Sequence, residues 1–324
     1  MDDRRQPIDF PSTSATSARR GRMLLRRLVG ALGAGLAAAG VLLSAHAHAA
    51  PPRVTLSAPV VETGGTLAVA LDGTPVTGSP RTIRLAFADQ PITLFPHPAK
   101  GDGTWVGLVA IPLSAAPGSA TLRVEWNDAG QRHTRNVAFR IVTGAYGEER
   151  LTVDPRHVRP SPAELERIRQ EQEKLRSVYA AGSPERLWSQ GFELPVPGEV
   201  NGAFGTRRVF NGELRSQHSG VDFRAAAGDP VRVSSSGVVR LAEELFFSGN
   251  AVIVDHGAGV FTSYSHLSRI DVAVGRRVEK GEVIGLIGAT GRATGPHLHW
   301  GVKVNAVTVN PLSFQQLMAA LTGG

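Results

Sequence analysis

Residues 249–264, GNAVIVDHGAGVFTSY, indicate the fold class of the C-terminal half of the chain. Two apolar runs, Ala251–Val254 and Phe261–Tyr264, flank a glycine-rich segment. Short runs of this kind, rich in β-branched and aromatic residues and bounded by glycine, are typical of β-strands joined by tight turns. Similar runs with single glycines continue to Leu312. We therefore predict an all-β domain over residues 191–324.

Residues 51–145 predict a second β-domain. Short strand-like runs are separated by glycine, proline, asparagine and aspartate, and apolar residues recur at every second position, as at Leu122 and Val124. Such runs, with turn residues between them, favour a small β-sandwich of immunoglobulin-like type. Its two histidines, His97 and His133, lie in different segments without a partner at ligand spacing, so we expect both to be surface residues.

Residues 146–190 connect the two β-domains and contain the start of a helix. Ser161 is a suitable N-cap, Pro162 suits the first helical position, and Glu164 completes a capping box. We predict a helical linker, with one helix starting here and a second, short helix starting at Ser183. The residues expected on the apolar face of the first helix are Leu165, Ile168, Leu175 and Tyr179.

Residues 1–50 have the three parts of an export signal. A cluster of arginines precedes an uncharged stretch, Leu28–Ala45, which is rich in alanine, glycine and leucine. Small residues follow in the pattern Ala-x-Ala up to Ala49. These features predict a cleaved signal peptide and an exported protein of the periplasm or cell envelope, by the Sec or the Tat route. If the segment were left uncleaved, it would be an N-terminal anchor in contact with the inner membrane.

Composition excludes several classes of protein and of site. The chain has 324 residues, of which 42% are hydrophobic, and this fits about two globular domains rather than long intrinsic disorder. It has no cysteine, so any metal site must use histidine and carboxylate ligands. Seven arginines and three aspartates in residues 1–50 account for +4 of the net charge of +7. Because the remainder is so small, we expect no nucleic-acid partner.

Four residues in the C-terminal half have the spacing of metal ligands. His218 and Asp222 are four positions apart, and His297 and His299 are two apart, so each pair shares one face of an extended strand. Either pair alone is more often a set of hydrogen-bonded core residues. Together, in one β-domain that also contains His266, they favour a site of two imidazoles and one carboxylate. Three such ligands leave a fourth position open, as in catalytic rather than structural zinc sites.

Several motifs follow one another through residues 202–311. They are His218–Asp222 (HSGVD), Gly249–Gly257 (GNAVIVDHG), Tyr264–Ser268 (YSHLS), Val278–Gly285 (VEKGEVIG) and Gly288–His299 (GATGRATGPHLH). In this order they resemble the lysostaphin/LytM-type zinc endopeptidases, which cleave peptide bonds in bacterial peptidoglycan. After the last motif this chain has Trp300 and Gly301, where the family often has an aromatic or aliphatic residue and then an acidic one.

The resemblance implies an antiparallel-β peptidase domain with one Zn²⁺ per chain. It assigns His218, Asp222 and His299 as the metal ligands, and His266 and His297 as unligated catalytic residues beside the bound water. Imidazoles with a pKa of about 6.5 can exchange protons at neutral pH. Which of the two is the general base stays open. The implied substrate is a peptide cross-link of peptidoglycan.

Other functions stay open at this point. An exported scaffold that activates other wall hydrolases would keep these residues without turnover, although the complete ligand set argues against it. A lipoyl- or biotinyl-carrier domain has similar glycine-spaced strands around a segment such as Val278–Glu282, but export argues against that class. For the sandwich we predict a role in positioning or restraint, for example by docking over the cleft and limiting access to it, and no motif specifies a regulatory protein partner. His256, in the second motif, is expected to be structural.

Overall fold

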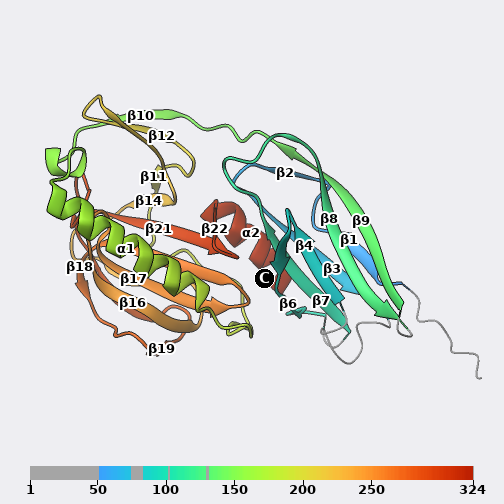
Figure 1. Cartoon of the computed structure of the whole chain (residues 1–324). Coiled ribbons are helices and arrows are strands. Elements are labelled where there is room, and N and C mark those ends of the chain that lie inside the picture. Colours follow the sequence, from blue (N-terminus) through green and yellow to red (C-terminus); the bar gives the residue numbers. More distant parts are fainter. Residues whose placement is uncertain (1–50, 74–82, 101–102, 129–130, 324) are drawn as a thin grey trace, which may run out of the picture. The chain divides into compact units, whose positions relative to one another are not determined.

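The computed structural model describes residues 51–73, 83–100, 103–128 and 131–323 (Figure 1). The expected export signal, residues 1–50, lies outside the described part of the chain. A membrane-spanning helix is not found within these ranges, because each helix there lacks either the length or the apolar character to cross a bilayer.

Residues 53–142 form two sheets that share one core. Leu67 from one sheet and Leu122 and Phe139 from the other are buried in the same apolar cluster, so this region is a β-sandwich. Its assignment to the immunoglobulin-like type stays a prediction. The first sheet has the order β1 (Arg53–Leu56), β3 (Thr66–Asp72), β7 (Thr104–Ala110) and β6 (Leu94–Pro96), and the second has the order β2 (Val60–Glu62), β9 (Gln131–Val142), β8 (Gly118–Asp128), β4 (Ile83–Phe87) and β5 (Gln90–Ile92).

The two histidines of the sandwich differ from the expectation that both are surface residues. His97 is buried, and its Nδ1 accepts hydrogen bonds from the backbone N–H groups of Ala99, at 3.1 Å, and Lys100, at 3.2 Å. His133 is half-buried and stacks on Trp126 with 5.3 Å between ring centroids. The prediction is therefore wrong for His97, which caps its own turn instead of facing solvent.

The C-terminal half is built on one sheet whose strand pairs are antiparallel. This confirms the mainly β fold class and the antiparallel domain that the resemblance implied. The sheet runs in the order β11 (Val200–Gly202), β14 (Val221–Arg224), β21 (His297–Val304), β18 (Val260–Ile270), β17 (Gly249–Gly257), β16 (Gly237–Leu245) and β19 (Arg277–Val278), and β15 (Pro230–Arg232), β20 (Val283–Ile287) and β22 (Val307–Val309) branch from it.

The hairpin of β17 and β18 is the one expected from residues 249–264. Its turn runs through Gly257, Ala258 and Gly259, whose φ angles are 75°, 52° and 78°. This left-handed conformation strongly favours glycine. A Cβ at Gly257 would also lie 1.7 Å from the backbone oxygen of Glu185, so the glycine permits the connecting segment to pass directly over the turn.

The core of the C-terminal sheet continues into the sandwich. Phe95 of the sandwich lies edge-on to Trp188, with ring centroids 5.5 Å apart. The side-chain amide of Asn305, in the turn between β21 and β22, donates to the backbone oxygen of Leu108 at 2.9 Å. The final helix, α2 (Pro311–Thr322), packs on the same cluster. The sandwich therefore contacts the C-terminal sheet through the β21–β22 turn and the apolar cluster beneath it.

Helix α1 (Pro162–Ala180) begins where the capping signals place it. The Ser161 hydroxyl accepts from the backbone N–H of Glu164 at 3.3 Å, and the Glu164 carboxylate accepts from the backbone N–H of Ser161 at 2.8 Å. Both orphan donors at the helix start are thus satisfied by the capping box. The predicted linker helix is confirmed.

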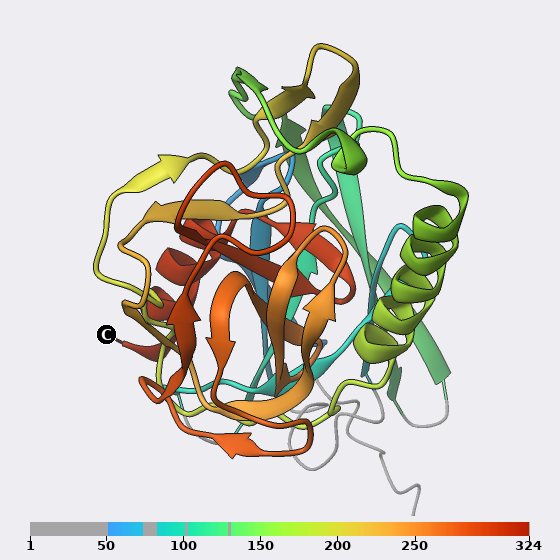
Figure 2. The same cartoon turned by 90° about the vertical axis from the view of Figure 1, so that its left-hand side faces the viewer.

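Helix α1 uses only part of its expected apolar face. Leu175 and Tyr179 pack against the cluster on β16, β17 and β18, and Figure 2 shows the helix alongside these strands. Leu165, by contrast, is 54% exposed, so its assignment to the packed face is wrong. The second helix expected from Ser183 is also absent from the described chain, where residues 181–190 form turns and bends.

A small three-stranded sheet lies beside the main one. It consists of β10 (Glu148–Leu151), β12 (Arg207–Phe210) and β13 (Leu214–Gln217), and a short 3-10 helix, η3 (Pro155–His157), follows β10. β10 pairs with β12 in parallel, so that Glu149 stands opposite Arg208. A segment from the predicted linker thereby becomes part of the surroundings of the candidate site.

Candidate metal centre

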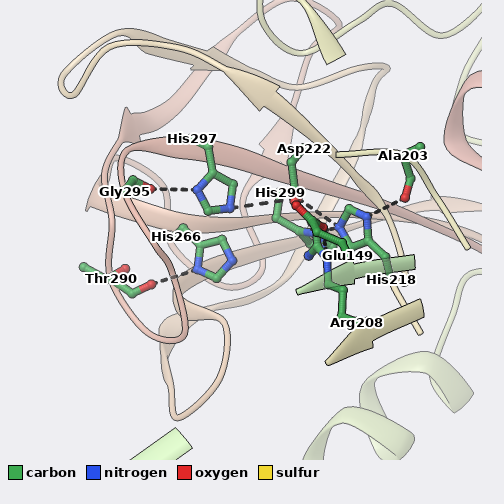
Figure 3. A network of polar contacts seen from close by, with 10 residues as sticks. All are labelled: Glu149, Ala203, Arg208, His218, Asp222, His266, Thr290, Gly295, His297 and His299. Carbon is green, nitrogen blue, oxygen red and sulfur yellow. Dashed lines mark hydrogen bonds and ion pairs between the residues drawn. The ribbon is translucent and has the colours of Figure 1, made fainter. Parts of the chain in front are cut away.

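The register of two neighbouring strands brings the predicted ligands together. β14 and β21 are antiparallel, and Asp222 on β14 stands opposite His299 on β21. His218 lies before β14 and outside any strand, so the shared strand face predicted for His218 and Asp222 is wrong, although the two side chains still meet. Because side chains alternate along a strand, His297 lies on the same face as His299. Figure 3 shows the side chains of the three predicted ligands, His218, Asp222 and His299, pointing at one another.

The three predicted ligands share one small volume. The Nε2 atom of His218 lies 3.0 Å from the Oδ1 atom of Asp222 and 3.0 Å from the Nδ1 atom of His299. The Nδ1 atom of His299 lies 2.8 Å from the same carboxylate oxygen. His218 and Asp222 are buried, and His299 is mostly so. Three potential ligand atoms therefore converge on one point.

Hydrogen bonding fixes which atom of His218 faces this point. Its Nδ1 atom is hydrogen-bonded to the backbone oxygen of Ala203 at 2.8 Å, so Nε2 is the ring nitrogen that faces Asp222. The Nε2 atom of His218 and the Oδ1 atom of Asp222 therefore face each other at 3.0 Å, a distance that places both among the atoms able to bind one cation. Two imidazoles and one carboxylate with an open fourth position are the donor set of catalytic zinc, so these residues fit the metal.

Electrostatics favour the protonation states that a metal requires. Burial alone would raise the pKa of Asp222, but its interactions with the adjacent His218 and His299 outweigh burial and hold the pKa well below the usual range. Burial lowers the pKa of His299, against the opposing effect of Asp222. An ionised carboxylate and a neutral imidazole are the forms that bind metal ions.

Two residues that the sequence argument did not single out complete the surroundings of Asp222. Arg208 donates from Nη2 to the second carboxylate oxygen of Asp222 at 2.6 Å and from Nε to Glu149 at 3.0 Å. Asp222 is thus held by one oxygen and presents the other to the two histidines. The Arg208 side chain is only 14% exposed. In the sequence, the only signal for Arg208 was its position next to the apolar pair Val209 and Phe210. No sequence signal indicated Glu149.

His266 has a strained backbone. Its φ angle is 66°, which is uncommon for any residue with a side chain. Its backbone N–H donates to Ser248 at 2.8 Å, and its Nδ1–H donates to the backbone oxygen of Thr290 at 2.8 Å. Burial, followed by the nearby His299 and His297, lowers the pKa of His266 to about 3. The ring is therefore neutral at pH 7, with its Nε2 lone pair free.

His297 repeats this arrangement next to His266. Its Nδ1–H donates to the backbone oxygen of Gly295 at 2.8 Å, and its Nε2 lies 3.9 Å from the Oδ1 atom of Asp222. The ring centroids of His266 and His297 are 4.7 Å apart, and Figure 3 shows the two rings side by side next to the ligand cluster. Both imidazoles thus keep one nitrogen available for proton exchange.

A cleft joins all five predicted site residues. One wall comes from β10 and β12, and the other from residues 288–296, the loop before β21. Of the described residues, those of the sandwich, up to Val142, do not line this cleft; the linker strand β10 does. Docking of the sandwich over the cleft stays a prediction. The residues that line the cleft include Glu149, Asn201, Arg208, Phe210, His218, Asp222, Phe247, His266, Arg292, Thr294, His297 and His299.

His256 has a different environment. It is fully buried, its Nδ1–H donates to the backbone oxygen of Ser236 at 2.9 Å, and its Nε2 lies 2.7 Å from the hydroxyl of Thr262. Burial lowers its pKa to about 4. Both ring nitrogens are used inside the sheet core, in agreement with the structural role expected for it.

Comparisons with known proteins place the matching region over the same motifs. Residues 216–311 match peptidase family M23. The chain is 48% identical over 96 residues to the DD-carboxypeptidase/endopeptidase Mpg of Neisseria meningitidis serogroup B, which covers 30% of this chain and 22% of that protein. It is 39% identical over 132 residues to the peptidoglycan DD-endopeptidase ShyA of Vibrio cholerae, which covers 40% and 31%. The chain thus spans less than a third of each of these relatives.

One solved structure resembles most of the chain. A putative peptidase M23 from Pseudomonas aeruginosa aligns with a TM-score of 0.56 and 30% sequence identity. The alignment covers 81% of this chain and 96% of that one, so it extends well beyond the motif region. With the ordered motifs and the converging ligand residues, it leads to one conclusion: the chain belongs to peptidase family M23.

Proposed function

We propose that this protein is an exported, zinc-dependent endopeptidase that hydrolyses peptide cross-links of peptidoglycan. The observation that carries the proposal is the convergence of His218 Nε2, Asp222 Oδ1 and His299 Nδ1 at 2.8–3.0 Å. The family membership and the endopeptidase names of two relatives support the substrate class. An activating scaffold without turnover would have no need of two further imidazoles with free nitrogens at the same point.

The proposed chemistry divides between binding and proton transfer. Zinc, when bound, would polarise the scissile carbonyl and lower the pKa of a water molecule. His218, Asp222 and His299 would hold the ion, and Arg208 would keep Asp222 in place through its second oxygen.

His266 and His297 would supply the proton transfer. Each commits its Nδ1–H to a backbone carbonyl, so Nε2 is the nitrogen that takes a proton from the attacking water or returns one to the leaving amine. Such groups typically contribute about 10²–10⁴-fold to the rate. Burial keeps the His266 ring neutral at pH 7, so its Nε2 atom can accept a hydrogen bond from a water molecule.

The test is digestion of purified peptidoglycan sacculi. We expect the purified protein to release new muropeptides, a chelator to abolish their release, and added zinc to restore it. Chromatography of the products with mass spectrometry would identify the bond that is cut. If no new muropeptides appear with zinc restored, the endopeptidase proposal is wrong and the scaffold alternative gains support.

We propose export on the pattern of residues 1–50 alone. Cell fractionation of the full chain and of a variant without residues 1–50 would test this. The full chain is expected in the periplasm or envelope, with a reduced mass if the signal is cleaved. The shortened variant is expected to stay in the cytoplasm. Equal distribution of the two would contradict the proposal.

A further inference from the structure

A cationic side chain in the cleft lies against two aromatic rings. The guanidinium carbon of Arg292 lies 4.3 Å from the ring centroid of Phe210 and 4.7 Å from that of Phe247. Phe210 ends β12, and Phe247 lies in the turn between β16 and β17. Arg292 belongs to the loop that leads to His297. The stack therefore fixes a positive charge in the wall of the cleft that contains the ligand cluster.

The backbone of this loop is fixed as well. The N–H of Arg292 donates to the backbone oxygen of Phe247 at 2.9 Å. The preceding Gly291 has φ of 71°, and a Cβ there would lie 2.3 Å from the backbone nitrogen of Gly249. Only a glycine permits so close an approach of the loop to the turn. Arg292 is thus anchored through both its main chain and its side chain.

The charge of Arg292 is not neutralised within the described part of the chain. No carboxylate there forms an ion pair with it, and its guanidinium makes no hydrogen bond to the described residues. The other arginine of the cleft, Arg208, is paired with Glu149 and Asp222. Burial, followed by the nearby charge of Arg208, lowers the pKa of Arg292 to about 10, so it stays protonated at neutral pH.

An unpaired and partly desolvated cation is unfavourable unless a ligand supplies the opposite charge and the hydrogen-bond acceptors. Contact with aromatic rings does not consume the N–H donors of a guanidinium, which stay able to form hydrogen bonds in the guanidinium plane. The group that matches those donors is a carboxylate, which accepts two parallel hydrogen bonds. Because the same cleft contains His266 and His297, such a carboxylate would belong to the peptide near the bond that is cut.

We propose that Arg292 is a specificity-determining residue that binds a free carboxylate of the peptide substrate. The inference rests on the proposed endopeptidase function and adds the chemical class that the substrate must carry beside its scissile bond. The carboxylate can come from a side chain or from the C-terminus of a wall peptide. Both sources offer the same chemistry, and the substrates used in the test distinguish them.

The test compares three soluble, cross-linked peptide dimers. One has all its carboxylates free, one has its side-chain carboxylates amidated, and one has its C-terminal carboxylate amidated. We expect the native protein to lose about 10- to 100-fold in kcat/KM on one of the amidated dimers, the range for one hydrogen-bonded charge pair. That dimer identifies the source of the carboxylate.

Variants at Arg292 should reproduce this loss. Arg292→Gln is expected to lose the same factor on the free dimer and nothing further on the critical amidated dimer. Arg292→Lys keeps the charge but not the planar guanidinium, so its kcat/KM on the free dimer should lie between those of the native protein and Arg292→Gln. Arg277→Gln removes an equal charge from an exposed position on β19 and should cleave all three dimers as the native protein does. Zinc content should be the same in all four proteins.

The possible results separate the two proposals. Equal rates of the native protein on all three dimers would overturn the role of Arg292, and so would an equal loss by Arg292→Gln on all three. If the zinc-loaded native protein cleaves none of them and also fails on sacculi, the endopeptidase function is wrong. In that case the equilibrium binding of the uncleaved dimers tests the role of Arg292. If the native protein binds one amidated dimer more weakly than the free dimer, and Arg292→Gln binds the two equally, the inference is supported. If the native protein binds all three dimers equally, the inference is wrong.

Discussion

The β-sandwich and the C-terminal sheet both bury histidines, but they satisfy them in opposite ways. In the sandwich, the His97 ring accepts hydrogen bonds from two backbone N–H groups of the residues just after it. In the C-terminal sheet, His218 and His299 direct ring nitrogens at one oxygen of Asp222. Burial with a local donor stabilises a turn, whereas ring nitrogens that converge on one carboxylate oxygen form a set of atoms that could bind a cation. The comparison shows that geometry, more than burial, separates the two roles.

The largest effect should come from removing a ligand. Asp222→Ala and His218→Ala are expected to lose bound zinc and all cleavage of sacculi, because two ligands cannot hold the ion. The matched variant in the sandwich, His97→Ala, should keep both zinc and activity and lose about 1–3 kcal/mol of stability through its orphaned N–H groups. Metal analysis, muropeptide release and denaturant unfolding measure the three quantities. If either ligand variant retained zinc, the proposed difference between the metal-binding histidines and the structural His97 would be wrong.

The next effect concerns the two unligated imidazoles. His266→Ala is expected to bind zinc as the native protein does and to lose about 10²–10⁴-fold in turnover, since a proton-transfer group is removed. His297→Ala should behave in the same way. The measurement is the cleavage rate of sacculi at matched zinc content. Parallel loss of zinc and activity would instead place these residues among the ligands.

A smaller effect is expected at the arginine behind Asp222. Arg208→Gln should weaken zinc binding by about 10- to 100-fold, as for other residues that orient a metal ligand. Glu149→Gln, which acts on Asp222 only through Arg208, should weaken it less. Competition with a chromogenic chelator gives both dissociation constants. Unchanged affinity in Arg208→Gln would show that Asp222 needs no support from β12.

The smallest effect is the pH dependence of the free energy of unfolding that the buried, structural His256 contributes. Its pKa is about 4 when folded and about 6.5 when unfolded, so the unfolded chain binds the proton first as the pH falls. The stabilising contribution of the neutral ring is complete above pH 6.5 and decreases towards pH 4. Between pH 7 and pH 5 we expect a loss of about 2 kcal/mol. His256→Gln should show a correspondingly flatter dependence in denaturant unfolding, and an identical slope would refute the assignment.

Local patterns were enough to predict much of the fold. The capping box at Ser161 identified helix α1, and the glycine-bounded runs identified the β17–β18 hairpin, because both signals act over a few neighbouring residues. The spacing of His218 from Asp222, together with the family resemblance, identified residues that the structure brings together. Their roles as ligands and catalysts stay predictions until metal and activity are measured.

The errors and omissions have a common physical cause. Leu165 was assigned to a packed face by helical period, but its side chain stays 54% exposed. His97 was expected at the surface because the backbone donors that bury it are not visible as a side-chain pattern. Glu149 reaches Arg208 through a parallel strand pair between distant segments. Tertiary contacts of this kind leave no local period to detect.

The pairing of β10 with β12 bears on how this catalytic module can be transferred between proteins. A fragment cut at the expected boundary, residue 191, would contain all five predicted site residues but would leave out strand β10. Arg208 would then exchange Glu149 for solvent, and the edge of β12 would be left open. Recombinant fusions and truncations should therefore start before Glu148, so that strand β10 is retained and keeps its pairing with β12.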